Sequence, residues 1–153
     1  MTFYTAASLR KDAPLTAAES VRTLQRESKA STLGRYDVFL SHSFLDAQLV
    51  IAVRQMFTSQ GLTVYVDWID DPLLDRNSVS PTTAARLRNR MNQSRTLVYA
   101  LSSAAAKSRW MPWELGYFDG LREQGRVSIL PIEDEGGTFA GQEYLGLYKL
   151  IER

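Results

Sequence analysis

The sequence contains no cysteine and only one histidine, His42, among its 153 residues. The absence of cysteine excludes disulfides, thiolate metal sites and cysteine nucleophiles, and a single histidine excludes a multi-histidine metal cluster. No segment approaches the roughly 20 consecutive apolar residues that a membrane-spanning helix needs. The N-terminus also lacks the charged and then apolar layout of a secretion signal. We therefore expect a cytoplasmic protein that binds no metal and crosses no membrane.

The composition is that of an ordinary globular protein, with 44% hydrophobic and 23% charged residues. A net charge of +1 argues against a surface built mainly to bind nucleic acid. The length is sufficient for one domain with a substantial apolar core. The sequence therefore predicts a single globular domain without a nucleic-acid partner.

Four short apolar runs of strand type alternate with stretches whose apolar residues recur at helical spacing. The expected strands are Tyr36–Leu40, Leu62–Val66, Thr96–Leu101 and Val127–Ile132. This alternation predicts an α/β, flavodoxin-like fold of three layers, in which helices cover both faces of a mainly parallel sheet of four to five strands. Residues 144–151 could add a short fifth strand or a terminal helix.

Residues 1–34 are expected to form an N-terminal helical extension, and residues 35–153 the main domain. Thr16 and Glu19 have the spacing of a helix capping box, so we expect a helix from about residue 17 to about residue 30. Two interpretations of this segment stay open: a mildly basic helix docked on the edge of the domain, or an arm that binds a partner.

Polar residues follow three of the expected strands. They are Ser41-His42-Ser43, Asp67-Trp68 and Ser102-Ser103. Because the carboxyl ends of parallel strands meet at one edge of the sheet, where ligands of such folds bind, we expect these groups to converge.

The segment from Ser108 to Phe118 carries one carboxylate, Glu114, in an otherwise apolar stretch with two tryptophans. Burying an unpaired carboxylate is costly, so Glu114 either faces water or lies in a cleft where its charge is used. Trp110 lies four residues before Glu114 and shares its helix face. We expect Trp110 on the pocket side and Trp113 in the core.

These segments, taken in order, resemble the TIR (Toll/interleukin-1 receptor) domain family. Tyr36–Ser43 resembles the first strand of the family, Val64–Asp67 the second, and Thr96–Ser102 the third. Trp110 and Glu114 match the tryptophan-to-glutamate spacing of enzymatically active members, and residues 68–80 lie where the family has its BB loop. The resemblance covers residues 34 to 132 and is closest to stand-alone bacterial TIR proteins of antiphage defence, such as those of Thoeris systems.

The resemblance implies cleavage of the N-glycosidic bond of NAD, with NAD as the substrate and no further cofactor. It implies that Glu114 is the catalytic carboxylate. The residues expected to bind the substrate are His42, Ser43, Phe44, Asp67, Trp68, Ser102, Arg109 and Trp110. Some members of the family carry basic residues where this chain has Ser43 and Phe44. Here Arg109, or the open helix end near Ser43, could meet the pyrophosphate instead.

A single carboxylate is chemically sufficient for this reaction. Ordinary glycosidases need two carboxyl groups, one of which protonates the leaving group. Nicotinamide leaves a cationic pyridinium as a neutral molecule, so no general acid is required. One carboxylate near the ribose can stabilise the oxocarbenium-like transition state.

Structural roles for the same residues remain as alternatives. His42 could be a turn histidine bonded to backbone, Asp67 could cap a turn, and Phe44 could be a core residue rather than a pocket lid. The acidic residues of the loop are expected to be solvated rather than to bind a cation: Asp70, Asp71 and Asp75. The basic residues Arg86, Arg88, Arg90 and Arg95 are expected to form a solvated helix face rather than a nucleic-acid patch.

Two functions from different classes fit the sequence. The first is an NAD-consuming enzyme whose ADP-ribose-derived product signals to a separate effector. The second is a non-catalytic TIR adaptor that acts by TIR–TIR contacts through residues 68–80 and the N-terminal segment. In both functions, the protein is expected to associate with other copies of itself. A more remote alternative is a nucleoside deoxyribosyltransferase-like enzyme, which also uses a single glutamate.

Overall fold

The structure is a computed structural model that describes residues 2–11, 34–43, 47–133 and 143–153. The helix expected near residues 17–30 and the candidate residue Phe44 lie outside these described residues. Residues 4–11 of the N-terminal extension are described, and they pack against the main sheet.

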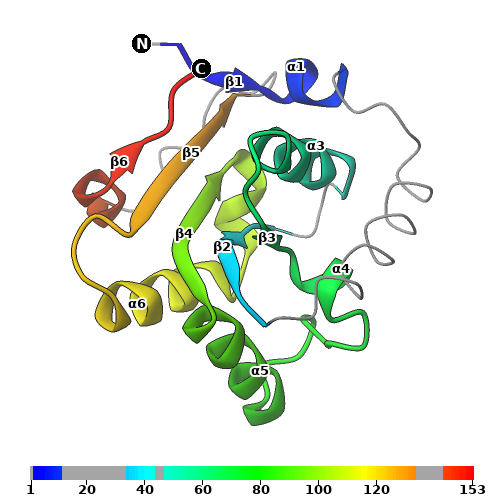
Figure 1. The fold of residues 1–153 in the computed structure, drawn as a ribbon, viewed down its shortest axis with the longest axis vertical. Coiled ribbons are helices and arrows are strands. Elements are labelled where there is room, and N and C mark those ends of the chain that lie inside the picture. Colours follow the sequence, from blue (N-terminus) through cyan, green and yellow to red (C-terminus); the bar gives the residue numbers. More distant parts are fainter. Residues whose placement is uncertain (1, 12–33, 44–46, 134–142) are drawn as a thin grey trace.

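The described strands form one sheet in which every pairing is parallel. They are β1 (Tyr4–Thr5), β2 (Tyr36–Ser41), β3 (Val64–Tyr65), β4 (Ser94–Leu101), β5 (Val127–Glu133) and β6 (Lys149–Leu150). The order is β1-β5-β4-β2-β3, and β6 also pairs with β5 (Figure 1). From β2 the chain goes first to β3 on one side and then to β4 on the other. The carboxyl end of β2 is therefore the switch point where ligands bind in open α/β sheets.

Helices cover both faces of the sheet, which confirms the α/β, flavodoxin-like fold class (Figure 1). The helices are α1 (Ala6–Lys11), α3 (Ala47–Thr58), α4 (Asp67–Asp70), α5 (Pro81–Asn92) and α6 (Met111–Leu121). Two short 3-10 turns, η1 (Ser103–Lys107) and η2 (Glu143–Leu147), complete the described elements. Within the described ranges, no helix combines the length and the apolar character needed to cross a membrane.

Side-chain alternation along the strands separates two apolar cores. Leu40 of β2 faces α1 and α3, and belongs to one buried cluster with residues of those helices. Phe39, one position earlier, faces α5 and α6 and belongs to the second cluster. Because successive residues of a strand point to opposite faces, Ser41 at the end of β2 points toward α6, and His42 points toward α3.

A serine cap and a proline begin α5. The Ser80 hydroxyl accepts a hydrogen bond from the Thr83 N–H at 3.2 Å, and Pro81 occupies the first turn. Proline fits there because the N–H that it lacks would have no helical partner. At the end of α3, Gly61 has a φ of 83° and turns the chain toward β3.

The segment after β3 differs from the sequence prediction. The strand expected over Leu62–Val66 is shorter, and residues expected in a loop form the one-turn helix α4. The Asp70 carboxylate accepts a hydrogen bond from the Val66 N–H at 2.8 Å, which stabilises this turn. Residues 144–151, left open as strand or helix, contribute to both η2 and the two-residue strand β6.

Candidate active site

Three segments that are distant in sequence meet at the carboxyl end of β2. Ser41 ends that strand, Asp67 begins α4 directly after β3, and Glu114 lies in the first turn of α6. All three side chains are buried, with at most 2% exposure. Of the polar groups expected to converge, Ser41 and Asp67 therefore lie around Glu114.

Glu114 lies within the apolar stripe of α6, not beside it. It follows Met111 by three residues and precedes Phe118 by four, and both of these side chains are fully buried. Its Oε1 accepts a hydrogen bond from the Ser41 hydroxyl at 2.9 Å. Helix geometry thus holds a carboxyl group inside the protein, pointed at the end of β2.

Burial raises the pKa of Glu114 to about 7 from its ordinary value of 4.5. The Arg76 guanidinium opposes this rise, the Asp67 carboxylate adds to it, and the hydrogen bond from Ser41 lowers the pKa slightly. Perturbed carboxyl groups of this kind concentrate at functional sites, because a buried charge is costly unless it is used. Glu114 can therefore exchange a proton near neutral pH and, when ionised, stabilise a cation beside it.

Arg76, on the segment between α4 and α5, connects the parts of this site. Its Nη1 forms an ion pair with Asp67 Oδ2 at 2.7 Å, and its Nη2 donates a hydrogen bond to the His42 carbonyl at 2.9 Å. Its own carbonyl accepts a hydrogen bond from Trp110 Nε1 at 3.0 Å. One loop residue thereby ties together the ends of β2 and β3 and the start of α6.

Sequence reasoning did not identify Arg76, and it named Ser41 only as part of a polar turn. The loop that contains Arg76 has no apolar periodicity, so no local pattern predicts where its side chains point. A weak signal was present: Arg76 is a cation directly after Asp75 in a loop otherwise marked by acidic residues.

His42 is a neutral hydrogen-bonding residue in this arrangement. Burial and, to a lesser extent, the Arg76 guanidinium lower its pKa to about 4 against the opposing effect of Asp67. One ring nitrogen, Nδ1, lies 2.9 Å from the Leu40 carbonyl, and Nε2 accepts a hydrogen bond from Trp68 Nε1 at 3.0 Å. These contacts assign the proton to Nδ1. The backbone-bonded interpretation of His42 is confirmed.

Trp110, which caps α6, was expected on the pocket side and Trp113 in the core, but their burial is the reverse. Trp110 is only 4% exposed and packs within the second core, whereas Trp113 is half-buried. The two rings meet edge to face at 5.2 Å, and the Arg88 guanidinium lies 5.2 Å from the Trp113 ring centre. The indole N–H explains the difference, since a buried indole requires an acceptor, and the carbonyl of Arg76 supplies one.

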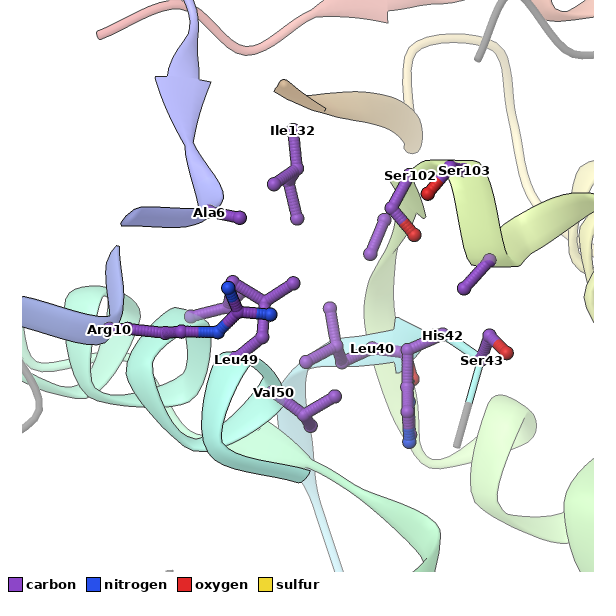
Figure 2. A pocket seen from close by; sticks show the side chains of 13 residues that line it. Ala6, Arg10, Leu40, His42, Ser43, Leu49, Val50, Ser102, Ser103 and Ile132 are labelled. Atoms are coloured by element: carbon purple, nitrogen blue, oxygen red, sulfur yellow. The ribbon is translucent and has the colours of Figure 1, made fainter. Parts of the chain in front are cut away.

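The remaining predicted site residues separate into two places. Asp67 belongs to the Glu114 side, where it pairs with Arg76, whereas Trp68 bonds His42 and packs against the first core. Ser43 and Ser102 instead line a cavity of about 210 Å³ on the α1 and α3 side of the sheet, where His42 also contributes (Figure 2). Arg109 is exposed.

The charged residues of the loop and of α5 are more ordered than the sequence suggested. Asp71 accepts two hydrogen bonds from Arg90, both of 2.8 Å, and a third from the Tyr65 hydroxyl. The expectation of solvation is therefore wrong for Asp71 and Arg90. In the described part of the chain, no group of three or more carboxylate or histidine side chains is placed to hold a metal ion.

Comparisons with known proteins show a family and two related proteins. The family model described as "TIR domain" matches residues 38–149. The chain is 48% identical over 120 residues to the "Probable 3' cyclic ADP-D-ribose synthase ThsB'" of Bacillus cereus (strain MSX-D12), a match that covers 77% of this chain and 61% of that protein. It is 34% identical over 93 residues to the "Putative cyclic ADP-D-ribose synthase TIR2" of Cytobacillus dafuensis, which covers 60% of this chain and 24% of that protein. The chain thus spans about three fifths and about a quarter of the lengths of these two relatives.

Proposed function

Since the chain belongs to the TIR domain family, we propose that it cleaves the bond between nicotinamide and ribose in NAD and forms an ADP-ribose-derived signal. Glu114 is the catalytic carboxylate of this proposal. The observation that carries it is a carboxyl group that is 1% exposed, bonded to Ser41, and held at a pKa of about 7 at the switch point of the sheet.

The reaction requires little more than this carboxylate. As the glycosidic bond breaks, its electron pair moves to the pyridinium nitrogen, and nicotinamide leaves as a neutral molecule. The ribose carbon becomes electron-poor, and the ionised Glu114 stabilises that charge. The cationic ring of bound NAD also favours ionisation of Glu114, because a nearby positive charge lowers the pKa of a carboxyl group.

Capture of the ribose carbon decides the product. Attack by water gives linear ADP-ribose, and attack by a hydroxyl of the same molecule gives a cyclic product; either nucleophile then loses its proton. The names of both relatives are those of cyclic ADP-ribose synthases, which favours the cyclic product. A carboxyl group buried among apolar side chains also favours it, because water is excluded there.

Substrate access requires the segment with Arg76 to move. A carboxylate that is 1% exposed cannot contact a nucleotide until a neighbour is displaced. Arg76 is the suitable neighbour, since its side chain is 12% exposed and polar contacts join it to Asp67 and His42. Opening of residues 71–80 would then expose Glu114 and leave Trp110 as a wall of the pocket.

The direct test is release of nicotinamide from NAD by the purified protein, measured by chromatography together with the other products. Glu114→Gln should lower the rate by a factor of about 100 to 1,000, as removal of a group that stabilises transition-state charge does. Glu123→Gln, an exposed carboxyl group beyond the end of α6, is the matched control and should retain the rate. Undiminished release by Glu114→Gln would exclude the proposed role.

Self-association through the loop is the second candidate activity, and exposed apolar side chains support it. Leu73 is 98% exposed and Val79 is 67% exposed on the segment that carries Arg76. Contact with another copy could bury these two side chains and shift the segment. Self-association would then open the path of the substrate to Glu114. Light scattering across a range of protein concentrations measures self-association, and NAD turnover is measured on the same samples. If the protein turns over NAD fully as a strict monomer, self-association is not required for catalysis.

The product would act on a separate effector in cytoplasmic antiphage defence. Cells that carry this protein and its effector should resist phage infection, and cells with Glu114→Gln should not. Protection that persists with Glu114→Gln would favour the non-catalytic adaptor.

A further inference from the structure

The cavity of about 210 Å³ lies on the opposite face of β2 from Glu114. Leu40, Val50 and Val53 of the first core form part of its apolar wall. His42 belongs to this cavity and also to the polar cluster, because it accepts a hydrogen bond from Trp68 and its carbonyl binds Arg76. A ligand that crosses the end of β2 could therefore occupy both places.

The N-terminal segment completes the cavity. Ala6 and Arg10 of α1 line it, and Ile132 of β5 lines it where β1 pairs with β5 through Tyr4. The start of α1 is fixed by reciprocal hydrogen bonds between Thr5 and Ser8, at 3.1 and 3.2 Å between backbone N–H groups and hydroxyls. This wall precedes the residues matched by the TIR domain model, which begin at residue 38.

The chemistry of the lining indicates the class of ligand. Its apolar walls enclose a space smaller than the roughly 300 Å³ of the smallest usual ligand pockets, so the space suits one flat ring system and not a whole dinucleotide. Among the described residues of the lining, Arg10 is the one that carries a charge at neutral pH. In Figure 2, Arg10 extends from α1 toward the cavity, with His42 on the opposite side. The lining thus combines an apolar slot with a cation at its rim.

We propose that this cavity binds the adenine end of NAD, with Arg10 in contact with the pyrophosphate, while the nicotinamide end lies across β2 at Glu114. This inference rests on the proposed function, and it assigns to the N-terminal segment a role in substrate affinity. Arg10 also supplies a positive charge for the pyrophosphate. Some members of the family have a basic residue where this chain has Ser43, so the charge would otherwise be missing. Arg109 is not among the lining residues.

Calorimetric titration of the full chain with ADP-ribose and with adenosine separates the two parts of the proposal. Arg10→Gln should weaken ADP-ribose binding about tenfold, because a charge-assisted contact to phosphate is lost, and should leave adenosine binding unchanged. Ala104→Phe, which fills the cavity from a half-buried position, should weaken both ligands. Lys11→Gln is the control, since Lys11 is an exposed neighbour of Arg10 outside the lining, and it should bind both ligands as the parent protein does.

Steady-state kinetics complete the test. Arg10→Gln should raise KM for NAD about tenfold with little change in kcat, and should not change cleavage of nicotinamide mononucleotide, which lacks the adenosine end. If NAD is cleaved but Arg10→Gln and Lys11→Gln have equal KM and equal ADP-ribose affinity, the cavity assignment is wrong. If NAD is not cleaved but ADP-ribose binds in an Arg10-dependent manner, the proposed function fails and the binding site remains.

Discussion

Replacement of Glu114 by glutamine should make the protein more resistant to unfolding as the pH rises. In the folded protein this carboxyl group holds its proton up to about pH 7, because burial disfavours the charge. In the unfolded chain the same group releases its proton near its ordinary pKa of 4.5. The folded state therefore binds more protons between these values, and the stability of the parent protein falls as the pH rises through that window.

The magnitude follows from the size of the shift. At about 1.4 kcal/mol per pKa unit, a rise from 4.5 to about 7 corresponds to a loss of about 3 kcal/mol between pH 4.5 and pH 7.5. Glu114→Gln has no proton to lose and keeps an oxygen that can accept the Ser41 hydrogen bond. The lowered pKa of His42 acts in the opposite sense, and stability from this group is lost as the pH falls from 6.5 to about 4. Both proteins share the His42 effect, so it cancels in the comparison.

Urea unfolding of both proteins at pH 4.5 and at pH 7.5, followed by circular dichroism, measures the difference. The decisive quantity is the change in the free energy of unfolding between the two pH values. Any cost of placing an amide in the site is the same at both pH values and cancels. Between pH 4.5 and pH 7.5, the free energy of unfolding should fall by about 3 kcal/mol more in the parent protein than in Glu114→Gln. An equal pH dependence for the two proteins would refute the assignment of a buried carboxyl group with a raised pKa.

Three further outcomes follow from the described contacts. The value of kcat/KM for NAD should increase as the pH passes about 7, because Glu114 must be ionised to stabilise the transition state; a flat profile between about pH 5 and 9 would contradict this role. Arg76→Ala should lower the free energy of unfolding by about 3 kcal/mol in urea titrations, since a buried carboxylate loses its partner, whereas the exposed Arg86→Ala should have little effect. Leu73→Asp should weaken self-association in light scattering relative to Leu147→Asp, a change at an exposed leucine elsewhere; equal association of the two would exclude the loop as the contact.

Much of the fold could be predicted from the sequence because local patterns determine it. The apolar runs gave the long strands to within two residues at each end. Ser80 followed by Pro81 is also a local pattern typical of a helix start, and α5 begins there. Short elements carried no such pattern. The two-residue strand β1 exists because an edge of β5 is available to pair with it, and this is a property of the assembled sheet.

The candidate site was predictable only in part, for the same reason. Glu114 was identifiable as an odd charge in an apolar stripe, and the structure brings it together with Ser41 and Asp67. Arg76 was not identifiable, since its contacts join residues that are far apart in sequence. The burial of Trp110 likewise depends on an acceptor supplied by a distant loop. Tertiary contacts, not propensities, set these features.

The pairing of β1 with β5 has a consequence for the order in which the protein matures. It joins residues 4 and 5 to residues 132 and 133, and contacts between such distant parts of a chain form late, because closing a long loop costs entropy. The cluster around Glu114 uses only residues 41–114, so it can assemble while β5 is still being synthesised. The wall formed by α1 must wait until β5 has been synthesised. We therefore expect a nascent chain to acquire its reactive carboxyl group before it acquires the cavity, which makes docking of the N-terminal segment a late step of biogenesis.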